Sequence, residues 1–380
     1  MDTSLKSMSC TGHSIIAGCL AGILIWVASV TFSFGQDSIH RRVILVGDAG
    51  EINPKQHQAL NDAAASIIAG KTTVMFLGDN IYPRGMGLPG SEEQAATQQI
   101  LRSQFSPMRA MGAPVYFVPG NHDWDKSGRN GLAKIRQMGH FLQDQHDPGL
   151  AMVPANGCPD PVEISLGDSL VVIAYDSEWW LFPYEKSDSA DGCGCHTREE
   201  VLSRMQEMKT RNAGKFLLLA SHHPFQSYGT HGGKYSLKDH IFPLTALKKW
   251  LFIPLPVIGS LYPALRTIFR NAEDLGHPLY KDMISRIGAV FQDDSNVVFV
   301  AGHEHGLQLI RDKRLQVVSG SGSKHSYAKM GKHSLFSDTR QGFVTIDLLA
   351  DNELAITYHA LSKQVMGTVF SFRLPWKALK

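Results

Sequence analysis

The chain has 380 residues, of which 43% are hydrophobic and 19% are charged. This apolar content is enough for a large buried core and excludes a disordered or fibrous chain. The 37 Lys and Arg residues nearly balance the 35 Asp and Glu residues, so the chain lacks the basic charge of a typical nucleic-acid-binding protein and we expect no nucleic-acid partner. The 17 His residues, several of them in short motifs with Gly and Asp, favour metal chemistry.

The N-terminal residues have the pattern of an export segment. Residues 14–36 carry no charge, and the single cation Lys6 precedes them. Small residues before Gln36 suit cleavage at that point, so 1–35 is predicted to be a signal peptide or, if uncleaved, an N-terminal membrane anchor. Both alternatives predict an exported domain over 36–380 that is periplasmic, extracellular or anchored on the outer side of a membrane.

Apolar runs of strand length alternate with amphipathic segments from residue 42 onward. Strands are predicted at 43–46, 72–77 and 115–118, with helices at 53–70 and 91–110 between them. A hairpin-like pair at 162–164 and 170–174, a polar helix at 197–212 and a strand at 216–220 follow. After a strand at 297–300, further strands are predicted near Leu307, Gln316, Phe343, Ala355 and Val369. Repeated strand, loop and helix units that lead into a late set of strands predict an α/β sandwich.

Beyond the export segment the chain has three cysteines, Cys158, Cys193 and Cys195. An oxidising compartment allows one disulfide, and Cys158 could pair with either of the other two, while three free thiols are the alternative. The pattern of Cys193, Cys195 and His196 does not favour an additional metal site.

Polar motifs follow five of the predicted strands at the point where each strand ends. In chain order they are Gly47-Asp48-Ala49-Gly50, Gly78-Asp79-Asn80-Ile81-Tyr82, Gly120-Asn121-His122-Asp123, Leu219-Ala220-Ser221-His222 and Gly302-His303-Glu304-His305. The carboxyl ends of strands form the ligand crevice of open α/β sheets, so we expect these loops to converge. Their mixed oxygen and nitrogen donors suit Fe, Mn or Zn, and the missing thiolates argue against a structural zinc site.

This ordered set resembles the calcineurin-like metallophosphoesterases and, within them, the purple acid phosphatases, especially the small tartrate-resistant kind. Ordinary members begin with Asp-x-His, whereas Ala49 and Gly50 follow Asp48 here, and Tyr82 takes the vacant place. The resemblance covers roughly residues 42–323 and includes the closing Ser319-Gly320-Ser321-Gly322. It implies a four-layer α/β/β/α metallophosphoesterase sandwich over 36–380.

The resemblance also implies a role for each motif residue. Asp48, Tyr82 and His305 would hold one metal, expected to be Fe(III). Asn121, His222 and His303 would hold a divalent ion (Fe, Zn or Mn), and Asp79 would bridge the pair. The alternative for Tyr82 is a core aromatic residue. His122 and His231 would be catalytic residues beside the phosphate, and one of them would protonate the leaving oxygen.

The function implied is that of a binuclear metal-dependent phosphatase, because two neighbouring cations lower the pKa of bound water and clamp phosphate oxygens. Its substrate would be a phosphate monoester on a small molecule or a protein. A phosphodiesterase with the same metals, and a non-catalytic metal-binding surface protein, are the alternatives.

Three further features leave alternatives open. His223 is expected either to pack in the core or to support its neighbour His222. The aromatic residues Trp179, Trp180, Phe182 and Tyr184 could form a rim over the pocket, although aromatic clusters more often belong to a core. An apolar insertion at about 248–283 includes the uncharged stretch 250–265, broken by three prolines. It is expected to contact a membrane surface, cap the active site, dock a partner, or pack against its own domain.

Overall fold

The computed structural model describes residues 38–187, 191–246, 250–255, 271–292, 294–363 and 365–376. The predicted export segment 1–35 lies outside the described residues, and so does 256–270 of the predicted insertion. The fold below is that of the unit Gly35–Lys380.

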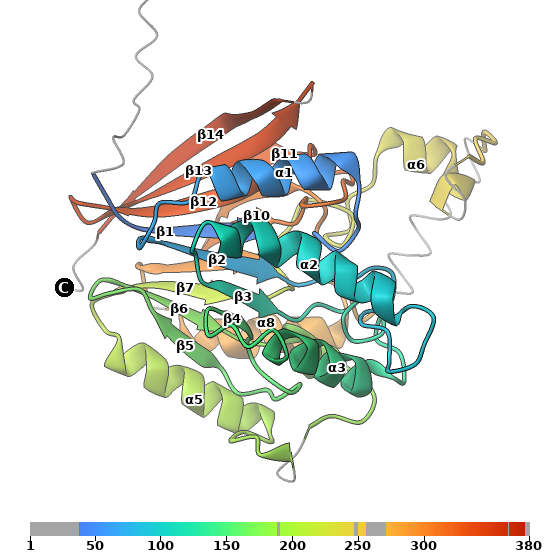
Figure 1. Ribbon diagram of the computed structural model, residues 1–380. Coiled ribbons are helices and arrows are strands. Elements are labelled where there is room, and N and C mark those ends of the chain that lie inside the picture. Colours follow the sequence, from blue (N-terminus) through green and yellow to red (C-terminus); the bar gives the residue numbers. More distant parts are fainter. Residues whose placement is uncertain are drawn as a thin grey trace, which may run out of the picture. The chain divides into compact units, whose positions relative to one another are not determined.

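The described residues of this unit form two mixed seven-stranded sheets (Figure 1). The first has the order β14-β13-β12-β1-β2-β3-β4 and the second the order β11-β9-β10-β8-β7-β6-β5. The strands of the first sheet are β1 (Ile39–Val46), β2 (Thr72–Leu77), β3 (Val115–Val118), β4 (Leu150–Met152), β12 (Gly342–Leu349), β13 (Glu353–Ser362) and β14 (Val365–Pro375). Those of the second are β5 (Val162–Ser165), β6 (Leu170–Ala174), β7 (Phe216–Ala220), β8 (Val297–Ala301), β9 (Leu307–Arg311), β10 (Leu315–Ser319) and β11 (Ser334–Asp338).

Helices connect the parallel strands of each sheet. β1 to β4 are parallel neighbours, joined in turn by α1 (Pro54–Ala65), α2 (Gln94–Ala110) and α3 (Gly131–Gln143). β6, β7 and β8 are also parallel, and between them lie α4 (Ser177–Leu181), α5 (Arg198–Arg211), α6 (Leu237–Ile241), the 3₁₀ helix η3 (Pro243–Ala246) and α8 (Pro278–Val290). Parallel strands require such crossovers, and their carboxyl ends lie at the same edge of the sheet.

The core has three apolar layers, which follow from the alternation of side chains along buried strands. Val43 and Leu45 of β1 face the other sheet and pack with Leu218 and Val298. Ile44 and Val46 face the opposite way, toward the apolar stripes of α1, α2 and α3. The outer face of the second sheet packs against α5 and α8 in the same manner. This arrangement of helix, sheet, sheet and helix confirms the predicted four-layer sandwich.

Most predicted elements are present, with shifted ends. β1 begins at Ile39 and α1 ends at Ala65, where the sequence predicted 43 and 70. The strands β4 and β11 and the helix α3 were not anticipated. α8 begins inside the range predicted as insertion, and Tyr280 and Met283 on it belong to the core.

Among the helices that the structure describes, none has both the length and the apolar character needed to cross a membrane.

Candidate metal centre

The five polar motifs lie at the carboxyl ends of both sheets. Their side chains come from the loops after β1 (Asp48), β2 (Asp79, Tyr82), β3 (Asn121, His122), β7 (His222) and β8 (His303, His305). The structure thus brings together all seven residues that the sequence proposes as metal ligands.

The backbone at three of these residues adopts the left-handed conformation. Asp48, Asp79 and His303 have φ angles of 57°, 52° and 68°. Such angles cost about 1–3 kcal/mol each in a non-glycine residue and persist where the surrounding structure enforces them. Gly78, with φ of 83°, completes the second loop, and a Cβ atom there would lie 2.4 Å from the His222 Nδ1 atom. A glycine is therefore required for His222 to reach its position.

The first group of donors consists of Asp48, Tyr82 and His305. The Tyr82 hydroxyl donates to Asp48 Oδ1 at 3.0 Å and lies 3.1 Å from His305 Nε2. His305 Nε2 is 3.4 Å from the same Asp48 oxygen. Asp48 Oδ2 accepts from the His303 backbone N–H at 2.7 Å, which fixes the carboxylate. The Tyr82 hydroxyl therefore belongs to this polar group and is not part of the apolar core.

The second group consists of Asn121, His222 and His303. His222 Nε2 lies 3.0 Å from Asn121 Oδ1 and 3.2 Å from His303 Nδ1. Asp79 Oδ1 is 3.4 Å from His222 Nε2. Atoms of Asp48, Asp79 and His222 lie within 4.8 Å of one another, so Asp79 stands between the two groups.

The positions of the ring protons of His222 and His303 make the second group suitable for binding a cation. His222 Nδ1 donates to the Leu77 carbonyl at 2.8 Å, and His303 Nε2 donates to the Glu273 carbonyl at 2.9 Å. A carbonyl oxygen only accepts, so in the neutral rings the nitrogens that face each other carry lone pairs. Two lone pairs and a carboxylate oxygen at this separation repel each other unless a positive ion lies between them. The residues present could thus hold a metal.

Burial sets the protonation of these groups. Desolvation lowers the pKa of His305 to about 4, and with the neighbouring His231 it holds the imidazole neutral. Burial and three adjacent imidazoles likewise hold the pKa of His303 well below its ordinary value. Burial raises the pKa of Asp48 to about 8, with Asp79 adding to the rise. Neutral imidazoles are the form that binds metal, and a positive charge nearby would favour the ionised form of Asp48.

His122 and His231, the expected catalytic histidines, border the two groups. His122 Nδ1 lies 2.6 Å from the Pro83 carbonyl, and its Nε2 is 3.9 Å from Asp79 Oδ2. The His231 ring lies over the His303 ring with 4.1 Å between centroids. Its Nδ1 is 3.2 Å from Asp274 Oδ1.

His223 supports the centre from behind and lies in a buried polar cluster. Its Nε2 donates to Glu273 Oε2 at 2.9 Å, and its Nδ1 accepts from the Ser177 hydroxyl at 2.9 Å. The Ser127 hydroxyl is 2.6 Å from Glu273 Oε1 and 2.8 Å from Glu178 Oε1. A hydroxyl has one proton to donate, so one of the two carboxyl groups is protonated. Burial raises the pKa of Glu178 well above its ordinary value and identifies it as that group.

Sequence reasoning missed the acidic residues around the centre. Glu273 and Asp274 lie in the range predicted as insertion, where no motif marks them, and Glu178 lies in α4. Glu304 stands inside the His303-Glu304-His305 motif, which could have drawn attention to it.

One cation also borders the first group. Lys324 Nζ lies 3.2 Å from the centroid of the Tyr82 ring and 3.5 Å from Glu51 Oε2. The preceding Ser323 donates twice to the Asp48 carbonyl, at 2.9 Å from its backbone N–H and 2.6 Å from its hydroxyl. Lys324 is therefore attached to the same rigid loop as a candidate ligand.

The aromatic cluster does not form a rim. Trp179, Trp180 and Phe182 are at most 5% exposed and pack in the apolar layers beneath the helices, whereas Tyr184 is exposed. The rim interpretation is wrong because these rings fill the space between α3, α5 and α8 and the sheets.

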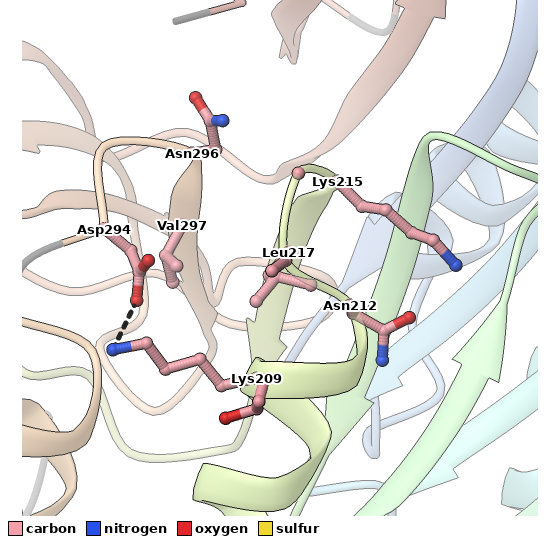
Figure 2. Close-up of a pocket in the computed structure, with 10 residues that line it drawn as sticks. Lys209, Asn212, Lys215, Leu217, Asp294, Asn296 and Val297 are labelled. Carbon is pink, nitrogen blue, oxygen red and sulfur yellow. Dashed lines mark ion pairs between the residues drawn. The ribbon is translucent and has the colours of Figure 1, made fainter. Parts of the chain in front are cut away.

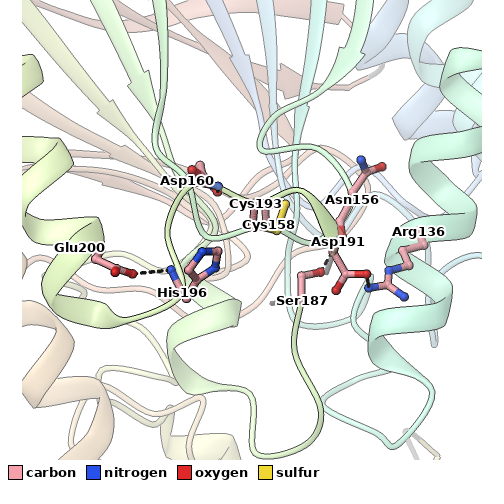
Figure 3. The surroundings of a disulfide bond; sticks show 10 residues. Arg136, Asn156, Cys158, Asp160, Ser187, Asp191, Cys193, His196 and Glu200 are labelled. Atoms are coloured by element: carbon pink, nitrogen blue, oxygen red, sulfur yellow. Dashed lines mark hydrogen bonds and ion pairs between the residues drawn. A yellow bond between two sulfur atoms is a disulfide. The ribbon is translucent and has the colours of Figure 1, made fainter. Parts of the chain in front are cut away.

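The structure contains a Cys158–Cys193 disulfide (Figure 3). It joins the loop after β4 to the loop before α5, where Arg136 forms an ion pair with Asp191. Cys195 is buried and free, so one of the two predicted pairings is present.

A pocket of about 250 Å³ includes the Lys209–Asp294 ion pair in its lining (Figure 2). Leu217 and Val297 line it from the beginnings of β7 and β8, whereas the motifs follow the ends of those strands. It therefore belongs to the opposite edge of the sheet and has no part in the metal centre.

Comparison of the sequence with protein families decides the class of the protein. The family described as calcineurin-like phosphoesterase matches residues 41–254. The chain belongs to the calcineurin-like phosphoesterase family. Phosphate-ester hydrolysis is the chemistry that this family name describes, and the resemblance of the motifs to the calcineurin-like metallophosphoesterases is confirmed. None of the curated proteins compared with this phosphoesterase matches it in sequence.

Three solved structures are similar to this phosphoesterase at low sequence identity. GAP50, described as the anchor in the inner membrane complex of Plasmodium, is 16% identical with a TM-score of 0.54, and the match covers 89% of this chain and 90% of that one. Purple acid phosphatase PPD1 from yellow lupin (Lupinus luteus) is 13% identical with a TM-score of 0.49, covering 88% and 53%. PhoD is 13% identical with a TM-score of 0.48, covering 88% and 69%. The chain spans about half the length of the lupin enzyme.

Proposed function

We propose that this phosphoesterase is a binuclear metal-dependent phosphatase of the purple acid phosphatase type that hydrolyses phosphate monoesters. Asp48, Tyr82 and His305 hold one ion, Asn121, His222 and His303 hold a divalent ion, and Asp79 bridges them. The observation that carries the proposal is the meeting of two imidazole lone pairs with the Asp79 carboxylate, 3.2–3.4 Å apart, at the ends of both sheets.

Metal ions bound there would supply the positive charge that lowers the pKa of water and neutralises the phosphate. The residues of the chain bind and orient the substrate. His122 and His231 are placed to donate hydrogen bonds to phosphate and leaving-group oxygens. Lys324 adds a positive charge beside Tyr82. A monoester carries up to two negative charges and a diester only one, so this additional cation favours the monoester.

Tyr82 supports iron at the first position. A phenolate is a hard, strongly donating ligand that suits Fe(III), whereas the second group of one amide and two imidazoles suits a divalent ion such as Fe, Zn or Mn. The hydroxyl of Tyr82 already lies 3.0 Å from Asp48 and 3.1 Å from His305.

We further propose that the protein is exported. Structural disulfides persist in oxidising compartments, and Cys158–Cys193 is of this kind. The uncharged segment 14–36 provides the signal or anchor. A phosphatase at that location would act on extracellular or periplasmic phosphate esters.

The test is a substrate panel on the metal-loaded protein. Phenyl phosphate, an alkyl phosphate and bis(p-nitrophenyl) phosphate are compared by kcat/KM, together with metal analysis of the same sample. We expect both monoesters to exceed the diester by at least tenfold. Faster turnover of the diester would establish the phosphodiesterase alternative, and metal binding without turnover of any ester would establish the non-catalytic one.

A further inference from the structure

Lys324 places a cation directly on the ring of a candidate metal ligand. Its Nζ atom lies 3.2 Å from the centroid of the Tyr82 ring. We propose that Lys324 is a positioning residue that acts through Tyr82: its ammonium holds electron density on the phenol ring and lowers the preference of the first metal position for a trivalent ion over a divalent one. The inference rests on the proposed function, in which Lys324 has a role only toward the phosphate.

The ammonium lies over a face of the Tyr82 ring. A distance of 3.2 Å to the centroid excludes an approach in the plane of the ring, because the ring atoms themselves occupy that space. The rings of His122 and His305 pack against Tyr82 as well, with centroids 4.5 and 6.2 Å away, and Tyr82 is only 6% exposed. A cation over a ring face is attracted by the π electrons, and the attraction is stronger where water is excluded.

The loop after β1 fixes the backbone of both partners. Tyr82 donates through its N–H to the Gly50 carbonyl at 3.0 Å. Ser323, which precedes Lys324, accepts at its carbonyl from Asn53 Nδ2 at 3.0 Å. The ammonium and the ring therefore start from two backbone positions that are attached to the same loop, and their contact does not depend on the flexible lysine side chain alone.

One carboxylate balances the ammonium, but only in part. Glu51 Oε2 lies 3.5 Å from Lys324 Nζ. The Glu51 side chain is 54% exposed, against 27% for Lys324. Water and salt screen such an exposed carboxylate, and ion pairs of this kind are weak. A net positive charge therefore remains at the face of the Tyr82 ring.

This charge changes what the Tyr82 phenolate gives to an ion. Electron density that the ammonium attracts is donated less to the metal. The ammonium also repels the ion itself, and it repels a trivalent ion more than a divalent one. Tyr82 and Lys324 thus have opposite effects at the first metal position: the phenolate favours Fe(III), and the ammonium limits that preference.

The experiment removes the charge of Lys324 in two ways. Lys324→Met keeps the apolar stem of the side chain, and Lys324→Gln is made alongside so that the comparison does not depend on the folding of one variant. Lys324→Arg keeps the charge. Lys329→Met, at an exposed lysine of the same segment, is the matched control. Each protein is reconstituted with iron and zinc, and its visible spectrum and metal content are recorded. Competition between Fe(III) and Zn(II) is measured in a chelator buffer.

We expect the visible band of Lys324→Met and Lys324→Gln to move to longer wavelength at full metal content. Light moves an electron from the ring to the ion, and without the ammonium the ring holds this electron less tightly. The ratio of Fe(III) to Zn(II) affinity should rise by about tenfold, the size expected for one partly screened unit charge near the ion. Lys324→Arg and Lys329→Met should keep the band and the ratio of the unaltered protein.

A band that stays in place, or an affinity ratio that stays equal or falls, would overturn the inference and leave the proposed function standing. Loss of metal from both Lys324→Met and Lys324→Gln would show a structural role and would also overturn it, as would an equal shift in Lys329→Met. If the iron-loaded unaltered protein has no visible band, Tyr82 is not a ligand, and the proposed first metal position fails together with this role of Lys324.

Discussion

Asp48, Asp79 and His303, three residues of the candidate metal centre, have a left-handed backbone conformation. Each follows directly or closely after a buried strand, and the sharp turn directs its side chain back over the sheet edge. Strained backbone positions of this kind persist because the surrounding structure enforces them.

Asn121→Ala and His222→Ala should each empty the divalent position, because each removes one of its donors. We expect loss of about one metal equivalent and a fall in kcat of at least about a hundredfold. Metal analysis with turnover of a chromogenic ester measures both. Asn130→Ala, at an amide that makes no capping bond to α3, is the control. Full metal content with near-normal activity in either variant would remove that residue from the ligand set.

Tyr82→Phe should abolish the colour of the iron-loaded protein. A phenolate bound to Fe(III) donates charge into the metal and produces a visible absorption band, which Phe cannot do. Tyr184→Phe, which removes an exposed phenol, should leave the band unchanged. The sample is reconstituted with iron before the spectrum is recorded, and a band that survives Tyr82→Phe would show that Tyr82 is not a ligand.

The sequence proposed the candidate ligands but not the residues that hydrogen-bond to them. Asp48, Asn121 and His303 stand in short motifs after strands, and their residue types reveal metal chemistry. Glu273 and Asp274 lie in a segment without a motif, and their contacts depend on where the chain returns after 256–270. These contacts join residues that are far apart in the sequence, so no local sequence pattern predicts them.

At the scale of elements, prediction succeeded where the pattern was local. The buried strands β2 and β3 have continuous apolar runs, and both were predicted with their observed bounds. The helix α3 was missed because Asn130 offers no side-chain cap and three consecutive left-handed residues, 125–127, precede it. The strand β4 has only three residues, and β11 is partly exposed, so neither shows clear alternation.

The strand β13 contains a histidine that should make stability depend on pH. Burial and then Arg42 lower the pKa of His359 to about 4, whereas an unfolded histidine has a pKa of about 6.5. The folded state therefore binds fewer protons between these values, and stability is lost as the pH falls from about 6.5 to about 4. His359 stacks on Phe343 and contacts Thr345, which holds it in the sheet.

His359→Gln should reduce the loss in free energy of unfolding at low pH by about 1–2 kcal/mol, a value discounted because His359 is partly exposed. Urea denaturation at pH 7.5, 5.5 and 4.5 measures it. His57→Gln, at an exposed position on α1, is the control and should follow the unaltered protein. Parallel pH curves for His359→Gln and the unaltered protein would contradict the assignment.

The segment 250–255 presents apolar side chains to solvent. Trp250, Phe252 and Ile253 are 71%, 56% and 48% exposed. Contact of 250–265 with a membrane surface stays a prediction, and 256–265 lies outside the described residues. Trp250→Ser with Phe252→Ser should lower binding to lipid vesicles several-fold while ester hydrolysis is unchanged, because aromatic residues favour the membrane interface. Sedimentation with vesicles measures the bound fraction, and Val365→Ser is the control. Equal binding by the double variant and the unaltered protein would count against the membrane interpretation.

At the scale of the whole molecule, the repeated strand, loop and helix units predicted an α/β sandwich, because parallel β-helix-β units have few ways to pack. The four layers were implied by the resemblance that the ordered motifs carry. The strand order and the addition of β12, β13 and β14 beside β1 could not be predicted, since they depend on pairing between distant segments.

The disulfide should contribute to global stability. It closes a loop with a sequence separation of 35 residues, for which loop entropy predicts about 3–4 kcal/mol. The double variant Cys158→Ser, Cys193→Ser should therefore unfold at a lower urea concentration, and reductant should shift the unaltered protein in the same direction. Cys195→Ser, which alters the free thiol, should retain the response to reductant. A double variant as stable as the oxidised protein would contradict this role.

The proposed centre draws on residues far apart in the order of synthesis. Asp48 and His303 are 255 residues apart and hydrogen-bonded, and β1 pairs with β12, which is made still later. A nascent chain thus exposes the early ligands long before the late ones leave the ribosome. A chain that crosses a membrane unfolded can assemble the site only on arrival, so the ions dissolved at the destination, and not those of the cytoplasm, would determine which metals the mature protein carries.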